Sequence, residues 1–218
     1  MKKIVFSLIV LLLVTLSACA KSPVIIEPLV CTENQIKADE VCVDLTGAEI
    51  QIKTSLEHTM ELENYRLTTI ILEGEMTVEV VSEFAENISK ITTPNKIDYF
   101  YKNDAVCEHL EISQDVTTQT IIACSENNNA LFIKQLEYQW FTIENGKYVV
   151  KEEYRSNLEE IFSNAFFDAS LQSFDLSVDS GYLSEISMSL LFGTEVIEMT
   201  LILDQINQVN ITWIGEVS

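Results

Sequence analysis

The sequence of 218 residues predicts an α+β protein with one mostly antiparallel sheet of about eight to ten strands and two helices. Apolar residues alternate with a period of two over most of the chain after residue 64, which is typical of half-buried strands. The connections between these runs are short, which favours antiparallel pairing. Two stretches change to the helical period instead.

The first helical stretch follows Thr46-Gly47-Ala48-Glu49, which fits the capping-box pattern of a helix start. The apolar spacing then continues through residues 47–63, so we expect one long N-terminal helix there. The second stretch follows a similar pattern at Ser156, and its apolar stripe predicts a short helix over residues 157–166.

The strands are expected from residue 64 to residue 213, and the short helix over residues 157–166 interrupts their series. Residues 76–91 would suit either a strand or a helix, and their β-branched content favours a strand. The clearest hairpin lies within residues 131–151, because Asn145-Gly146 is a strong type I′ turn signal. In that hairpin Glu144 and Lys147 are expected to face each other as an opposite-charge pair.

The N-terminus has the pattern of an export signal. Lys2 and Lys3 precede a largely apolar run at residues 4–16, which is shorter than the roughly 20 residues of a membrane-spanning helix. The run ends in Leu16-Ser17-Ala18-Cys19.

This tetrapeptide resembles the lipobox of bacterial lipoproteins. The resemblance implies that residues 1–18 are a cleaved signal peptide and that Cys19 carries the lipid. Residues 19–30 would then be a lipidated tether, and the protein would sit on the extracytoplasmic face of a bacterial membrane, anchored through Cys19. Cleavage would remove two lysines and no acids, which would change the net charge from −21 to −23.

The acidity of the chain excludes some partners. Asp and Glu number 34 against 13 Lys and Arg, so no basic stripe is present to meet the phosphates of nucleic acid. The same charge opposes electrostatic docking on anionic lipid. No protein partner is indicated by the sequence.

The remaining four cysteines can pair in three ways. Proximity favours Cys31 with Cys42 and Cys107 with Cys124. The first pair would close a small disulfide loop at residues 31–45, followed by a single sheet domain at residues 46–218. The second pair would join neighbouring strands of a hairpin that turns near residues 114–115, with Cys107 opposite Cys124.

The sequence predicts a protein that is not an enzyme and that uses no metal or other cofactor. The glycine-rich, nucleophile-elbow and zinc-protease motifs are absent. The two histidines, His58 and His109, are far apart in the sequence, no C-x-x-C pair accompanies either, and we expect both on the surface. Residues 175–181 resemble a calcium loop only in part, and a strand followed by a turn explains them better.

The order of elements carries a second resemblance. It resembles the lipoprotein-carrier-like superfamily, which includes mycobacterial lipid-binding lipoproteins. The matching stretches are ENYRLTTIILEGE, the hairpin KQLEYQWFTIENGKYVVKEEY, YRSNLEEIFSNAF and the closing strands from DLSVDSGYLSEISMSLLF to NQVNITW. That family implies a curved half-barrel covered by its helices, with an apolar interior that takes hydrophobic ligands. The candidate lining residues are Leu67, Ile71, Tyr99, Tyr138, Trp140, Phe162, Phe166 and Met188.

The same periodicity is also expected of a sandwich whose core is completely filled, because most apolar side chains simply pack. The alternative is therefore a structural or interaction lipoprotein that presents an acidic face to a partner.

Overall fold

The computed structural model describes residues 30–38, 41–103, 106–114, 116–123, 132–165 and 169–215. The chain divides into two compact units, Met1–Asp44 and Leu45–Ser218, one residue before the boundary expected from the sequence. Among the described residues, no helix has both the length and the apolar character needed to cross a membrane. The expected signal peptide, Cys19 and nearly all of the tether lie outside these residues.

The first unit contains a two-stranded antiparallel ladder, β1 (Gln35–Ala38) and β2 (Val41–Asp44). A disulfide joins Cys31 to Cys42, with 5.5 Å between the two Cα atoms, and this confirms the first expected pairing. The Gln35 side-chain amide donates a hydrogen bond of 2.7 Å to Asp44.

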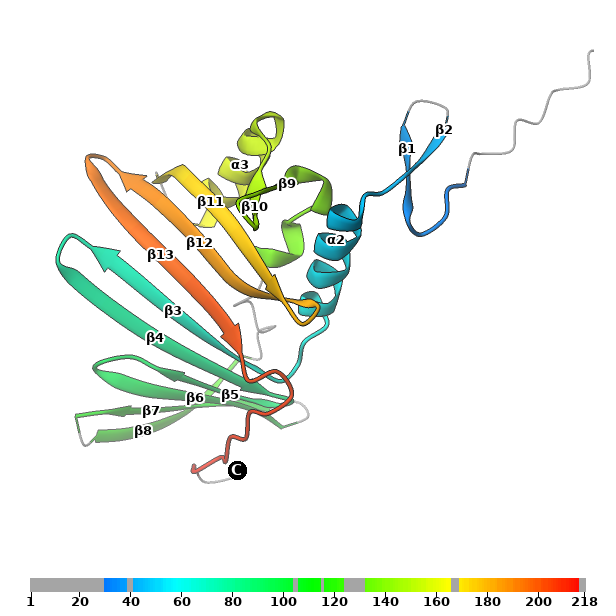
Figure 1. Cartoon of the computed structure of the whole chain (residues 1–218). Coiled ribbons are helices and arrows are strands. Elements are labelled where there is room, and N and C mark those ends of the chain that lie inside the picture. Colours follow the sequence, from blue (N-terminus) through cyan, green and yellow to red (C-terminus); the bar gives the residue numbers. More distant parts are fainter. Residues whose placement is uncertain are drawn as a thin grey trace, which may run out of the picture. The chain divides into compact units, whose positions relative to one another are not determined.

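The second unit contains one antiparallel sheet, and every adjacent pair of its strands runs in opposite directions (Figure 1). In space the strand order is β8-β7-β6-β5-β4-β3-β13-β12-β11-β10-β9. This sheet has eleven strands in the described part of the chain, which exceeds the expected eight to ten. The strands are β3 (Tyr65–Glu73), β4 (Met76–Ala85), β5 (Ile88–Thr92), β6 (Lys96–Asn103), β7 (Val106–Ser113), β8 (Val116–Ile122), β9 (Phe141–Glu144), β10 (Lys147–Val150), β11 (Ala169–Asp179), β12 (Tyr182–Phe192) and β13 (Glu195–Asp204).

The ambiguous stretch at residues 76–91 is confirmed as strand. It forms β4 and most of β5, joined by a tight turn in which Glu86 has a positive φ of 43°. The calcium-like run at residues 175–181 is likewise the end of β11 and a turn, with Ser180 at φ 52° and Gly181 at φ 82°.

The first helix is shorter than expected. α2 (Gly47–Met60) has 14 residues, and the expectation of a long helix over residues 47–63 is wrong at its C-terminal end. The chain leaves the helix at Glu61 and turns toward β3, where the Asn64 side chain is bonded to the backbone of Val209. The capping box is confirmed at the other end, because Thr46 and Glu49 exchange backbone and side-chain hydrogen bonds.

The second helix, α3 (Arg155–Ala165), begins before the residue expected to cap it. A short 3₁₀ turn, η4 (Glu152–Tyr154), leads directly into it, so Ser156 lies inside the helix. The Arg155 guanidinium donates two hydrogen bonds of 2.9 Å to the carbonyls of Leu171 and Gln172 on β11. These bonds fix the start of α3 against the sheet.

The Asn145-Gly146 hairpin is confirmed. Both residues have positive φ, 52° and 83°, as a type I′ turn requires, and Lys147 lies opposite Glu144. The Lys147 amine, however, bonds Asp175 at 2.7 Å and Glu185 at 3.4 Å, on the next two strands. Residues 132–140 are not strand and contain two 3₁₀ turns, η2 (Ile133–Gln135) and η3 (Tyr138–Trp140).

The strand expected at residues 209–213 does not form. Val209 is clamped by Asn64 through two hydrogen bonds of 2.9 Å, and Trp213 stacks on Tyr101 of β6 at 5.2 Å between ring centroids. The C-terminal segment, residues 205–215, therefore crosses beside β6–β8 instead of pairing as a strand (Figure 1).

The core lies between the two helices and one face of the sheet, which we call the helix-covered face. α2 contacts β12 and α3 contacts β11, and Figure 1 shows both helices on the same side of these strands. Phe162 of α3, Leu176 of β11 and Leu190 of β12 have no solvent exposure.

Candidate functional site

Strand register determines which side chains share the helix-covered face. Leu67 of β3 lies opposite Leu203 of β13 and Ser82 of β4, and these partners face the same way because side chains alternate along each strand. From this row the face extends through Met188 on β12 and Asp98 on β6.

Most of the candidate lining residues prove to be core. Leu67, Trp140, Phe162 and Met188 belong to one buried cluster, and Tyr138 packs partly buried against it. They pack beneath the helices, and the three cavities described beside Ile52, Leu171 and His58 are lined by other residues. Phe166 lies outside the described residues.

Tyr99 is a wrong assignment as a lining residue. Its neighbours Asp98 and Phe100 lie on the helix-covered face, so Tyr99 points to the opposite side of β6, where it faces Leu110 of β7. Leu110 is only 2% exposed, and the C-terminal segment crosses beside this side of the sheet.

Ile71 lies on a part of the helix-covered face that is closer to the hairpin ends of β3, β4 and β13. It lies opposite Val78 of β4 and Met199 of β13, and these residues continue an apolar row of the core. In the next row toward the hairpin ends, Glu73 of β3 lies between Met76 and Ile197. Here the side chains are no longer buried: Val78 is 40% exposed and Met76 is 63% exposed. We call this group the apolar strip, and its members are Ile71, Met76, Val78, Val80, Ile197 and Met199.

The apolar strip is continuous with the core. Met199 packs against the buried cluster and pairs with Met188 on β12. Exposed apolar groups on neighbouring strands form a contiguous surface on which water is unfavourable, and such surfaces mark binding sites for other apolar groups.

A cluster of ionisable side chains lies farther along the same face, on β6 and β7. Asp98, only 6% exposed, accepts a hydrogen bond from Lys96 and contacts His109 Nε2 at 2.8 Å. Lys96 also bonds Glu111 at 3.1 Å, and Phe100 stacks on the His109 ring at 4.6 Å. Hydrogen bonds to Glu111 and Asp98 raise the pKa of Lys96 above its ordinary value.

The donor atoms of Asp98, His109 and Glu111 lie within 4.8 Å of one another, which is close enough for a divalent metal ion. The Lys96 ammonium, however, already lies between the two carboxylates and supplies the positive charge that they need. We therefore interpret the cluster as an ion network of the protein itself. His109 is half-buried in it and is not the plain surface residue that we expected.

The sequence contained a signal for this cluster that was missed. Ile97, Tyr99 and Tyr101 alternate, which places Asp98 on the other face of the same strand. A β6–β7 hairpin register then brings His109 and Glu111 to that face. The register depends on the length of the turn after Asn103, which composition alone does not give.

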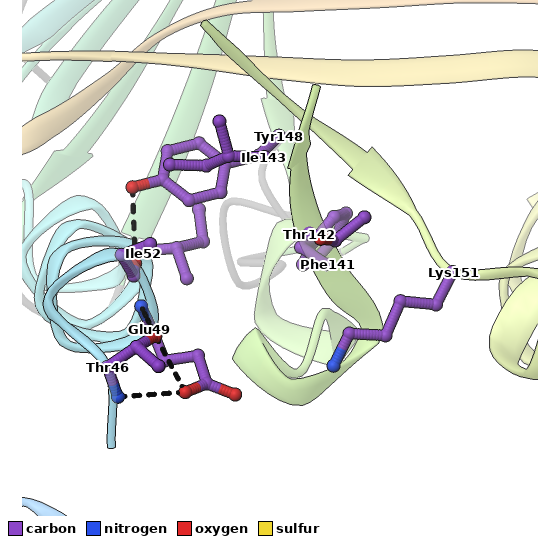
Figure 2. A pocket seen from close by; sticks show the side chains of 9 residues that line it. Thr46, Glu49, Ile52, Phe141, Thr142, Ile143, Tyr148 and Lys151 are labelled. Carbon is purple, nitrogen blue, oxygen red and sulfur yellow. Dashed lines mark hydrogen bonds between the residues drawn. The ribbon is translucent and has the colours of Figure 1, made fainter. Parts of the chain in front are cut away.

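A pocket with opposite charges at its sides lies at the start of α2. A cavity of about 230 Å³ lies between this helix and the β9–β10 hairpin, lined in part by Ile52, Phe141 and Tyr148. Glu49 and Lys151 lie at its two sides (Figure 2).

Both charged groups of this cavity have other partners. The Glu49 carboxylate accepts bonds of 2.9 and 2.8 Å from the Thr46 N–H and hydroxyl, and these bonds, with the positive charge of Lys151, lower the pKa of Glu49. Lys151 donates to the Gln139 carbonyl at 2.9 Å. The volume is below the roughly 300–1,000 Å³ of typical ligand pockets, and we interpret the cavity as a surface cleft that helps define the helix start.

His58 is positioned by packing. Its Nδ1 lies 3.1 Å from the Gly181 carbonyl, and its ring lies 5.6 Å from that of Tyr182. The nearby cavity of about 270 Å³ is lined by His58, Glu61 and Glu63, among others. The His58 ring thus contacts a backbone carbonyl and an aromatic ring.

Cys107 of β7 is disulfide-bonded. In the β7–β8 ladder it lies opposite Ile122, so the expectation that it faces Cys124 directly is wrong by two residues. Cys124 lies outside the described residues, and its pairing with Cys107 stays a prediction.

No protein-family model matches the chain, and no curated protein matches it.

Proposed function

We propose that the protein is a non-catalytic bacterial lipoprotein that holds a hydrophobic ligand on the apolar strip. The main support is that apolar side chains on the helix-covered face continue beyond the helices and are exposed to solvent there. Met76 is 63% exposed and Val78 is 40% exposed.

The anchor part of the proposal is supported by the lipobox-like Leu16-Ser17-Ala18-Cys19 after a short apolar run. Two or three acyl chains on Cys19 would hold the domain at the membrane, because each buried methylene contributes about 0.8 kcal/mol. The anchor would then hold the domain close to membrane lipids, whose acyl chains are hydrophobic ligands of the proposed kind.

The ligand part is supported by the order and direction of the strands. An antiparallel sheet with both helices on one face is the arrangement expected of a carrier-like half-barrel. In this proposal the helices close the β11–β12 half of the face, and an acyl chain covers the β3–β4–β13 half. The cluster around Lys96 and Asp98 would border the ligand on the β6 side.

A matched pair of variants tests the ligand part. Val78→Glu places a charge in the apolar strip, whereas Leu72→Glu places one on the opposite face of the sheet at a similar exposure, 38% against 40%. Non-covalent lipid is extracted from each purified full-length protein and measured by mass spectrometry. We expect Val78→Glu to retain at least about tenfold less lipid than the wild type, since a carboxylate opposes apolar contact, and Leu72→Glu to retain the wild-type amount. Equal retention by all three proteins, or no lipid in any of them, contradicts the proposal.

The anchor is tested separately with Cys19→Ala in the producing bacterium. The variant should leave the membrane fraction and lose the mass of the covalent lipid. If the variant remains with the membrane as the wild type does, the lipid anchor is refuted while the ligand proposal stands.

The filled core beneath the helices favours a second candidate, an interaction lipoprotein. Leu176, Leu190 and Phe162 have no solvent exposure there, and the chain carries a net charge of −21. In this case no lipid would be extracted, and a basic polypeptide would co-purify with the protein at low salt and dissociate at high salt.

A further inference from the structure

The two edges of the eleven-stranded sheet differ in how they are protected. β9 is one edge and has only four residues, one of them the charged Glu144. β8 is the other edge, and within the described residues no strand pairs with its outer side. It has seven residues, and all but Ile122 are exposed.

The sequence of β8 has none of the residues that normally prevent edge strands from pairing. Its sequence VTTQTII contains no charge, proline or glycine, although 22% of the whole chain is charged. Six of its seven residues are β-branched, which favours strand pairing. Val116 is 62% exposed and Ile121 is 71% exposed. Long uncharged edges of this kind are templates for another strand.

The sequence of β8 is also complementary to itself in the antiparallel direction. A two-fold axis at Gln119 would place Thr118 opposite Thr120, Thr117 opposite Ile121 and Val116 opposite Ile122. Threonine pairs and pairs of β-branched residues each stabilise neighbouring strands by about 0.2–1 kcal/mol. The Gln119 side chain donates a hydrogen bond of 2.5 Å to Glu108 of its own β7.

We propose that β8 is the homodimer interface of this protein, pairing antiparallel with β8 of a second copy about an axis at Gln119. A chain with a net charge of −21 repels its own copy, so self-association requires a contact that adds no further like charge. β8 provides such a contact, and the pairing joins the two sheets edge to edge.

The register gives a test that only this pairing passes. Full-length Thr117→Cys and Ile121→Cys proteins are prepared separately, mixed in equal amounts in mild detergent and oxidised. The mixture should form a disulfide-linked species of twice the mass, because these two positions face each other between copies. Either variant alone should form several-fold less, since each position then faces an unmodified residue.

Val196→Cys is the matched control, because Val196 is 49% exposed and β-branched but lies on β13 inside the sheet. Mixed with Ile121→Cys, it should give no dimer above the wild-type background. Cross-linking of this control to the same extent, equal cross-linking by each single variant, or no cross-linking in the mixture overturns the proposal.

Salt provides an independent readout on the unmodified protein. Raising the ionic strength from about 0.1 to 1 M shortens the screening length from about 10 to 3 Å. The dimer fraction should rise with salt, because the only charge effect is repulsion between copies. A dimer that dissociates as salt is added contradicts the β8 pairing and indicates an interface made of ion pairs.

Discussion

The helix-covered face of the sheet has two halves that share one strand pattern but differ in what covers them. On β11 and β12, α2 and α3 bury Leu176 and Leu190 completely. On β3 and β4, the neighbouring row of Met188 and Met199 continues as Ile71 and Val78, and Val78 is 40% exposed. Strand alternation therefore determines which face of the sheet a side chain lies on, whereas its burial depends on which other segments of the chain cover that face.

The largest difference between the two halves is expected in how much a substitution to alanine lowers the free energy of unfolding. Leu190→Ala should lower the free energy of unfolding by about 2–5 kcal/mol, because a fully buried side chain leaves a cavity. Val78→Ala should change it by less than about 0.5 kcal/mol. Urea unfolding measures both, and equal losses would mean that the apolar strip is part of the packed core.

The ion cluster on β6 and β7 gives the next prediction. Lys96→Met should lower the free energy of unfolding, because buried Asp98 loses a charged hydrogen-bond donor. The loss should be modest, since Lys96 itself is exposed to solvent. The change should also free two carboxylates and His109 for a metal ion. Added Zn²⁺ should then raise the melting temperature of Lys96→Met but not that of the wild type.

The control for this prediction is a second substitution, His109→Gln, in the Lys96→Met protein. It should abolish the effect of Zn²⁺ on melting, since the nitrogen ligand is gone. A wild-type protein that responds to Zn²⁺ as strongly as Lys96→Met would show that the lysine does not occupy the cation position.

The start of α2 should show a pH-dependent effect. Hydrogen bonds from Thr46 lower the pKa of Glu49, so their contribution is present above the ordinary carboxylate range, near pH 4, and is lost as pH falls through the lowered pKa. Thr46→Ala should lower stability by about 1 kcal/mol at neutral pH. The difference from the wild type should shrink in acid, and chemical unfolding at several pH values checks this sign. A difference that grows in acid would contradict it.

The smallest effect is expected on the opposite face of the sheet. Arg66 and Asp204 form a two-bond ion pair between β3 and β13, at 2.7 and 2.6 Å, and both side chains are about a third exposed. Asp204→Asn should cost about 0.2–1 kcal/mol, and less at high salt. A loss above 2 kcal/mol would show that this face is covered in solution.

The sequence predicts local features of this fold well. The type I′ turn at Asn145-Gly146, the capping box at Thr46 and the Cys31–Cys42 disulfide depend on residues close together in the chain, and the structure contains all three. Leu67 and Met188 were likewise placed on the inner face from their alternation.

Features that depend on distant contacts were not predictable in the same way. Val209 and Trp213 alternate as a strand would, but Asn64 and Tyr101 hold them in an irregular segment beside β6–β8. Tyr99 and the cluster around Asp98 were missed because strand register, which fixes the face of every side chain, depends on turn lengths. The filling of the core by Trp140 and Phe162 depends on where 3₁₀ turns and helices pack, and periodicity carries no information on that.

In the proposed function, the acyl chain of a lipid lies on the apolar strip. The most direct test is photo-cross-linking of the full-length protein with a fatty acid that carries a diazirine at mid-chain, followed by mapping of the labelled peptides. We predict label on β3, β4 and β13 at Ile71, Val78 and Met199, and its loss in Val78→Glu. Label on Leu72 or Val196 of the opposite face at the same level, or labelling unchanged by Val78→Glu, would contradict the claim.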